Sequence, residues 1–537
     1  MESRKQSSFY NFISGNTLSR KSYFLFFMSL ATTRWYSFST PSTIVMALFS
    51  IFVGEYMTTP SNRTSPFVNS KKRYLGFTET VLHNRYKKSA GASNVGAILQ
   101  VTGTLHLKNV EETLKKLMST HPLLRATISE ENGISSIEHS SSSQPTLPLL
   151  ILNKTNDESS KQHLEKILDL PFPQDSNFLW EIIVMENHDR DGTHDILLKA
   201  HHCILDGISI AIFMEQFMNI YNRVAEPYLE MPFLKAHEDF VTPQTNWTRY
   251  LVKHILDEVW ATIFPEGPHQ KKCRMHESGP LLFSARHTKL SFAHFTHEEL
   301  CQLISQCRKN KTTLTALLTA ALLQATRQVF GNLIIETIDT PVSVRQNFSK
   351  NVTDGDHLGC YVAGVKIRIP VKNTDTTWDL AQLYRENLLK YMPVIYPANF
   401  IPSSWKVAIM SSATLSTKPQ FSSGIGVSSL GSRDFINRKD YAELQLKNFY
   451  FCSSKRYGAK IMAIYAAQAG GKLDLCFAHP DKLVNENNAE KIKELTMQIL
   501  KNILKHGNCL HEEKQFSASN LIFSAPDAPA SQLNMTI

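Results

Sequence analysis

The stretch KAHHCILDGIS, residues 199–209, decides how this chain is interpreted. Two adjacent histidines end a strand-forming run, and Asp206 and Gly207 precede a helical pattern. Because neighbouring residues of an extended chain point to opposite faces, only one of His201 and His202 can enter a given cavity. An imidazole suits general-base chemistry near neutral pH, and Gly207 would allow a tight turn. An ordinary turn between a strand and a helix is the alternative interpretation.

Helical and extended patterns alternate irregularly on both sides of this motif. No GxGxxG run and no phosphate-binding glycine loop is present, so a nucleotide-binding doubly wound sheet is not indicated. The mixture predicts an α/β fold of α+β type, with two lobes of mixed sheet and helices. Helices are predicted at residues 109–122, 161–170, 208–224, 297–310, 312–330, 377–392 and 486–504. Strands are predicted at residues 95–107, 123–128, 146–152, 178–188, 194–202, 332–345, 361–369, 425–430, 459–467 and 472–478.

Composition shifts along the 537 residues predict five segments. They are an N-terminal extension (1–73), an N-terminal lobe (74–226), a Pro- and Gly-containing connector (227–286), a C-terminal lobe (287–510) and a flexible tail (511–537). The extension is open to three interpretations: a targeting segment, a membrane-proximal segment, or a gene-model artefact preceding a later start of translation. Its two apolar runs, residues 22–31 and 43–54, are each shorter than the roughly 20 residues that span a bilayer.

Charge and cysteine content narrow the possible partners. The net charge is +9, but residues 1–75 alone contribute +7, so the rest of the chain is nearly neutral. No basic platform for nucleic acid is seen. The eight cysteines form no CxxC pair, which argues against a zinc site and predicts no bound metal. Scattered cysteines suit a cytoplasmic protein, and weak membrane association through the N-terminal segment stays open.

The pattern His201-His202-x-x-x-Asp206-Gly207 resembles the HHxxxDG signature of the CoA-dependent acyltransferase superfamily. This superfamily includes alcohol acetyltransferases, polyketide-associated acyltransferases, plant BAHD enzymes and the condensation domains of nonribosomal peptide synthetases. The resemblance extends in order from about residue 75 to residue 505. It includes residues 109–128, the helix opening the second half, residues 341–365 and the VSSLG stretch at residues 427–431.

The resemblance implies two lobes similar to chloramphenicol acetyltransferase, with the active site in a channel between them. His202 and Asp206 would form the catalytic motif, with His202 as the general base that takes a proton from an alcohol or amine. Asp206 would act mainly through a structural pair with Arg345, and His201 and Gly207 would support the motif. No covalent acyl-enzyme and no bound cofactor is implied, and acyl-CoA would be the co-substrate.

Departures from the family pattern leave the donor and the activity open. The BAHD sequence DFGWG is absent, Cys360 stands where many relatives have Asn, and Ser429 replaces the Asn of Ser-Asn-Leu-Gly. Ser428 and Ser429 are candidate oxyanion donors, with a simple strand-end role as the alternative. Cys203 is expected to pack rather than react. The main expectation is an O-acyltransferase. The alternatives are a condensation enzyme using a carrier-protein thioester, which would make a carrier protein a partner, and a non-catalytic binding protein. Substrate-binding residues, acyl chain length and acceptor identity are not specified.

Overall fold

The structure is a computed structural model, and it describes residues 68, 70–89, 91, 93–131, 133–140, 146–153, 159–173, 176–186, 192–224, 229–239, 287–330, 337–345, 356–367, 369, 371, 375–398, 424–432, 441–456, 460–481 and 483–507. These residues belong to a compact unit that begins at Ser65. The predicted flexible tail, nearly all of the N-terminal extension and most of the connector lie outside the described residues.

The first lobe is built on a five-stranded sheet with the order β12-β2-β7-β6-β5. Its strands are β2 (Asn94–Gly103), β5 (Leu149–Asn153), β6 (Trp180–Glu186), β7 (Thr193–His201) and β12 (Leu444–Ser453). Neighbouring strands are antiparallel except β5 and β6, which are parallel. Both faces of β2 and β7 are buried, because both strands are rich in valine, isoleucine, leucine and alanine.

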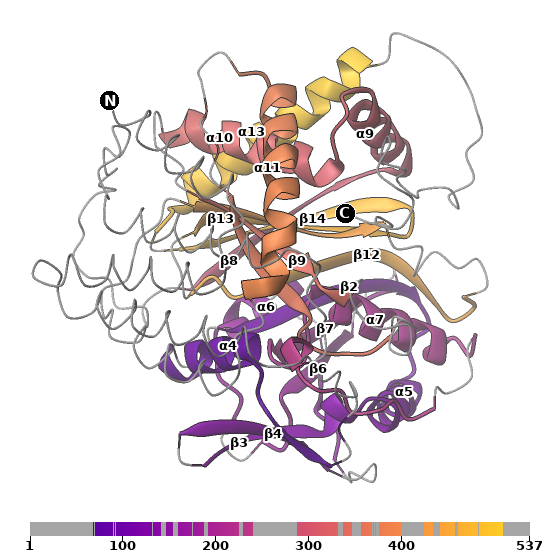
Figure 1. Cartoon of the computed structure of the whole chain (residues 1–537). Coiled ribbons are helices and arrows are strands. Elements are labelled where there is room, and N and C mark those ends of the chain that lie inside the picture. The colour runs from indigo at the N-terminus through magenta and orange to yellow at the C-terminus, as the bar shows by residue number, and fades with distance from the viewer. Residues whose placement is uncertain are drawn as a thin grey trace, which may run out of the picture. The chain divides into compact units, whose positions relative to one another are not determined.

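Helices cover this sheet, and a small second sheet lies beside it. The helices are α4 (Phe77–Lys88), α5 (Leu107–Thr120), α6 (Ser160–Leu168) and α7 (Gly207–Tyr221). Helix α7 contacts β2 and β12, whereas α6 contacts β2 and β7 and also reaches the second lobe. The small sheet has the order β1-β4-β3, from β1 (Lys72–Tyr74), β3 (Ala126–Glu131) and β4 (Ile134–His139), and lies at the bottom of Figure 1.

The second lobe has a six-stranded sheet with the order β10-β9-β11-β13-β14-β8. Its strands are β8 (Thr288–Phe295), β9 (Thr337–Ser343), β10 (Val362–Ile367), β11 (Gly424–Ser432), β13 (Lys460–Ala469) and β14 (Lys472–Pro480). Helices α9 (His297–Lys309), α10 (Leu314–Phe330) and α13 (Glu486–Gly507) lie above it in Figure 1, and α11 (Thr377–Ala398) contacts α10 and the edge strand β10. Helix α10 is buried along most of its length, as its leucine- and alanine-rich sequence predicts.

Strand β12 connects the two lobes. It lies in the second half of the sequence, yet it pairs with β2 in the first sheet and contacts β13 and β14 of the second (Figure 1). The Phe449 backbone N–H donates to the Asp474 carboxylate of β14 at 2.8 Å. The segment predicted as the C-terminal lobe therefore supplies one edge strand to the N-terminal sheet.

The predicted mixed α+β fold of two lobes is confirmed. The elements whose periodicity was strongest, including α5, α7, α9, α10 and α13, lie within a few residues of their predicted ranges. Helix α4 and strands β1, β4, β8 and β12 were not predicted. Helix α4 lacks a clear apolar stripe, because polar and charged residues interrupt it on every side.

Candidate active site

The histidine motif joins strand β7 to helix α7. His201 is the last residue of β7, and Gly207 is the first residue of α7. Asp206 is the N-cap: its Oδ1 accepts a hydrogen bond from the Ser209 backbone N–H at 2.7 Å, which satisfies one of the helix's free donors. The five residues between strand and helix, 202–206, are thus held at both ends.

His201 is fully buried and faces helix α4. Its ring lies 4.5 Å from the Tyr86 ring, and its Nε2 lies 3.4 Å from His83 Nδ1. Its Nδ1 accepts a hydrogen bond from the Cys203 backbone N–H, so in the neutral ring the proton is on Nε2. Burial and the nearby His83 and His202 keep the pKa of His201 well below its ordinary value. A neutral, enclosed ring of this kind supports the motif loop by packing.

His202 is half-buried, and its backbone N–H donates to the Ser93 carbonyl oxygen at 3.1 Å. Burial lowers the pKa of its imidazole below the ordinary value of 6.5. Asp206 and backbone carbonyl groups oppose this shift, whereas the Lys455 charge adds to it. The ring is therefore neutral near pH 7, which is the form that can accept a proton. The two histidines occupy different environments, as the alternation of an extended chain predicts.

The Asp206 carboxylate connects the two halves of the chain. Its Oδ2 accepts one hydrogen bond from Arg345 Nη1 at 2.7 Å and another from the Tyr361 backbone N–H at 2.9 Å. The Arg345 guanidinium also lies over the Tyr361 ring, 4.6 Å from its centre. Burial raises the pKa of Asp206, but Arg345 and the backbone donors outweigh it and hold the pKa below its ordinary value. The carboxylate is therefore ionised and acts as a connector.

Ser209 and Gly359 complete this network, and the sequence alone did not reveal them. The Ser209 hydroxyl donates to the Gly359 carbonyl oxygen at 2.7 Å and accepts from the Gly359 N–H at 3.0 Å and from Arg345 Nη2 at 2.7 Å. A Cβ on Gly359 would lie 2.4 Å from the Tyr361 ring, so only glycine fits there without a shift. One signal of this contact was present in the sequence, the glycine at position 359 in the stretch that resembles the family pattern.

Glycine is required at position 207 for a different reason from the one predicted. Its backbone does not take a positive φ, so the turn itself does not require glycine. A Cβ would instead lie 3.1 Å from the Phe451 ring on β12 and 3.2 Å from the Leu430 side chain on β11. Gly207 therefore lets the start of α7 approach both strands closely. The predicted turn is present at residues 202–204, but it does not depend on a positive φ at Gly207.

The remaining candidates from the sequence occupy ordinary structural positions. Cys203 is buried, its Sγ contacts the Glu79 carbonyl oxygen at 3.1 Å, and burial raises the pKa of the thiol well above its ordinary value. Cys360 is buried, and its carbonyl oxygen pairs with His237 Nδ1 at 3.2 Å. Ser428 and Ser429 lie half-buried on β11. Their role as oxyanion donors stays a prediction.

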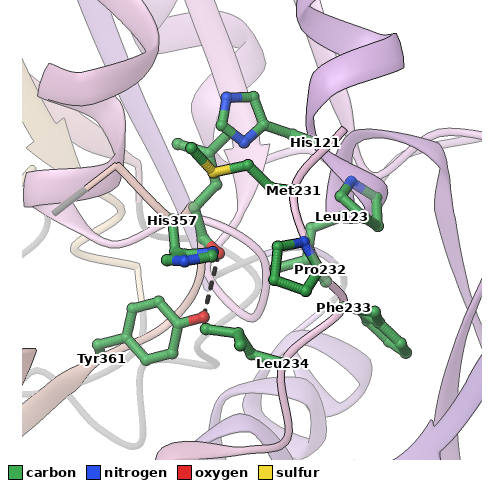
Figure 2. A pocket seen from close by; sticks show the side chains of 10 residues that line it. His121, Leu123, Met231, Pro232, Phe233, Leu234, His357 and Tyr361 are labelled. Carbon is green, nitrogen blue, oxygen red and sulfur yellow. Dashed lines mark hydrogen bonds between the residues drawn. The ribbon is translucent and has the colours of Figure 1, made fainter. Parts of the chain in front are cut away.

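A small hollow borders the Arg345 side of the network. It holds about 250 Å³ of empty space, part of it open to solvent, and is lined by residues that include His121, Met231, His357 and Tyr361 (Figure 2). The Tyr361 hydroxyl donates to the Leu358 carbonyl oxygen at 3.2 Å at its edge. His202 does not line this hollow, so the predicted channel at the motif stays a prediction.

Two further properties concern only the described part of the chain. No cluster of three or more His, Cys, Asp or Glu side chains there has the arrangement of a metal site. None of its helices combines the length and hydrophobicity needed to cross a bilayer. The predicted membrane association rests on the N-terminal segment, which lies outside the described residues.

The chain matches known proteins over most of its length. A family model described as the condensation domain matches residues 79–518. Trichothecene 15-O-acetyltransferase from Fusarium sporotrichioides has a similar structure, with a TM-score of 0.59, 13% identity, and coverage of 80% of this chain and 95% of that chain. The first condensation domain of the calcium-dependent antibiotic synthetase has a TM-score of 0.58 and 13% identity, and covers 81% of this chain and 96% of its own. These two likenesses establish the fold.

The chain belongs to the condensation-domain family. Gramicidin S synthase 2 from Brevibacillus brevis is 22% identical over 422 residues. These residues make up 77% of this chain but only 9% of the synthase. The chain thus spans about a tenth of the length of such curated relatives.

Proposed function

We propose that this protein transfers an acyl group from acyl-CoA to an alcohol or amine, with His202 as the general base. The observation that carries the proposal is the neutral, half-buried His202, held on a loop that the Asp206–Arg345 pair fixes to the second lobe. Because His202 Nδ1 is buried, we assign Nε2 as the nitrogen that accepts the proton.

The proposed reaction needs no covalent enzyme intermediate. His202 Nε2 takes the proton of the acceptor hydroxyl while its oxygen forms a bond to the thioester carbonyl carbon. The tetrahedral intermediate then collapses, and the carbon–sulfur bond breaks. The imidazolium returns its proton to the departing thiolate, which leaves as free CoA. The raised pKa of Cys203 disfavours its thiolate, which supports direct transfer over a cysteine acyl-enzyme.

Asp206 acts in this proposal as a positioning residue. Its oxygens are occupied by donors from Ser209, Arg345 and Tyr361, so it has no role in proton transfer to His202. His201 supports the loop from behind through its packing on Tyr86. The acceptor class is supported by the structural likeness to an acetyltransferase whose name specifies an oxygen acceptor.

A carrier-protein thioester is the second candidate donor. It is favoured by the curated relatives, which are named as peptide synthases. The proton transfer at His202 would be the same, and only the leaving thiol would differ. A panel of acyl-CoA and acyl-phosphopantetheinyl-carrier donors, offered with the same acceptors, separates the two.

The test of the proposal is a screen for acceptor-dependent release of CoA or carrier thiol from these donors. We expect release by the wild type and a loss of about 100-fold or more in His202→Ala. His294→Ala, which removes an exposed histidine on β8, is the matched control and should retain activity. A wild type without release on any donor, or a His202→Ala variant as active as the control, would show that the proposal is wrong. Tight CoA binding without turnover would favour a binding protein.

A further inference from the structure

Lys455 lies close to the histidine motif, although it is more than 250 residues away in the sequence. In the first sheet, Asn94 of β2 pairs with His201 of β7, and its carbonyl oxygen accepts from the Ser454 backbone N–H just past the end of β12 at 2.9 Å. The three residues therefore form one row across neighbouring strands. His202 directly follows His201, and Lys455 directly follows Ser454. Both therefore lie at the same end of the strands of this sheet.

The Lys455 backbone is firmly held. Its N–H donates to Thr288 Oγ1 at 2.7 Å, and that hydroxyl donates to Asp169 Oδ1 at 2.9 Å. The Ser454 hydroxyl donates to the same Asp169 oxygen, and Arg456 Nη1 donates to the Asp169 carbonyl oxygen at 2.9 Å. These bonds join both lobes at this point, so the position of Lys455 is set before any substrate binds.

The Lys455 ammonium group is buried but lacks a carboxylate partner among the described residues. Lys455 as a whole residue is only 8% exposed. Its Nζ donates to Ser453 Oγ at 3.3 Å and lies 4.8 Å from the centre of the Tyr465 ring. An ammonium has three N–H donors, and these contacts occupy one of them with an oxygen acceptor.

The two carboxylates whose charges act on Lys455, those of Asp339 and Asp169, each bond to other groups. Asp339 forms an ion pair with Lys460 at 3.0 Å, and the two Asp169 oxygens accept bonds from Thr288 and Ser454. Buried lysines ordinarily have a partner, because an unpaired buried charge is costly. Lys199, on the neighbouring strand β7, follows this rule with Glu181 at 3.0 Å.

We propose that the Lys455 ammonium group binds a carboxylate carried by one of the two substrates of the acyl transfer. This inference rests on the proposed function, because it names the substrate class of the same site. The neighbouring Lys460 is paired with Asp339 at 3.0 Å, so the Lys455 ammonium, beside one hydroxyl and one ring, leaves one positive charge that a single carboxylate matches in sign.

The proximity of the cation to the base supports this placement. Burial lowers the pKa of Lys455 to about 8, and the nearby Cys452, Asp339, Cys476 and Asp169 limit the shift. The group is thus mainly charged at pH 7. The same charge contributes to lowering the pKa of His202, which places Lys455 within electrostatic range of the reacting groups. A carboxylate bound there would partly neutralise it.

The carboxylate can belong to the acceptor or to the acyl chain, and two series of probes separate these sources. The acceptor series compares 3-hydroxybutyrate and serine with their methyl esters. The donor series compares succinyl-CoA with butyryl-CoA. Binding is measured by titration calorimetry without turnover, so that it does not depend on the catalytic step. We expect the wild type to bind the carboxylate form about 10- to 100-fold more tightly in one series.

Variants of Lys455 decide whether this group is responsible. We expect Lys455→Met and Lys455→Gln to reduce the preference to about twofold or less, with unchanged circular dichroism. Lys199→Met, which removes a buried but paired lysine from the same sheet, should keep the preference. A wild type without preference in both series, or a preference that survives both Lys455 variants, would overturn the inference. A preference that depends on Lys455 in a protein without CoA release would support the subsite and reject the proposed activity.

Discussion

The ion pair between Asp206 and Arg345 is the contact whose loss we expect to be most costly at the site. Asp206→Asn keeps the size of the side chain but exchanges one acceptor oxygen for an NH₂ donor. One oxygen position faces the Ser209 N–H, and the other faces both Arg345 Nη1 and the Tyr361 N–H. Either orientation of the amide therefore points a donor at a donor. The variant also leaves a guanidinium that is only 11% exposed without its counter-charge.

Removing one partner of a buried ion pair typically costs about 3–5 kcal/mol of the free energy of unfolding. We expect a loss of this size for Asp206→Asn and for Arg345→Gln. The double variant should lose less than the sum of the two, with a coupling energy of about 1–3 kcal/mol. Burial opposes the shift, but the net effect of Arg345 is a lowered pKa of Asp206. The stabilisation is therefore complete above the unfolded pKa of about 3.9, and is lost as the pH falls through the lower folded pKa.

The assay is urea unfolding at pH 7 and pH 5, followed by both circular dichroism and tryptophan fluorescence. Coincident curves from the two probes justify a two-state treatment. The control cycle uses Lys72 and Glu131, an exposed pair whose side chains are 38% and 72% exposed, and which should couple only weakly because solvent screens both charges. A coupling between Asp206 and Arg345 no larger than in this control, or one that disappears at pH 5, would refute the reasoning.

Three further outcomes follow from the structure. Gly359→Ala should destabilise the protein by about 1–3 kcal/mol in urea unfolding, because its Cβ would meet the Tyr361 ring at 2.4 Å. The control Gly364→Ala should destabilise it less, because a Cβ there meets nothing within 4 Å. Cys203→Ala should keep most of the CoA release in steady-state kinetics, because its thiolate is disfavoured; a complete loss with an intact fold would contradict direct transfer. His121 has its pKa lowered by burial to about 4, so stability should fall as the pH drops from about 6.5 to 4. Urea titrations at several pH values measure this fall in the free energy of unfolding. In His121→Gln it should be shallower by up to about 1.4 kcal/mol per pH unit. An unchanged slope would exclude His121 as the source of the pH dependence.

The sequence predicted the fold class and the main elements because their apolar periodicity is strong. Helix α10 and strand β7 are recognisable from their own residues, since both are buried on nearly all sides. Strand β12 was missed although the alternating burial of its first half is itself a strand pattern. Its partner β2 lies more than 300 residues earlier. Its place in the first sheet depends on long-range pairing that local pattern does not encode.

The candidate site was predicted in part. The resemblance to a known family suggested the pair between Asp206 and Arg345, and their contact at 2.7 Å is present. The hydrogen bonds of Ser209 to Gly359 were beyond prediction, because they join residues 150 positions apart. Lys455 gave no signal in the sequence either: its burial, and its lack of a carboxylate partner in the described part of the chain, are visible only in three dimensions.

The pH dependence of kcat/KM for acyl transfer tests the role of His202 most directly. Burial lowers the pKa of this imidazole below 6.5, so the wild-type rate should rise with pH along a single-proton limb and reach a plateau near neutrality. In His202→Ala this limb should vanish, and the plateau should fall by about 100- to 10,000-fold. A variant that keeps the limb, or loses less than about tenfold in rate, would contradict the assignment of His202 as the general base.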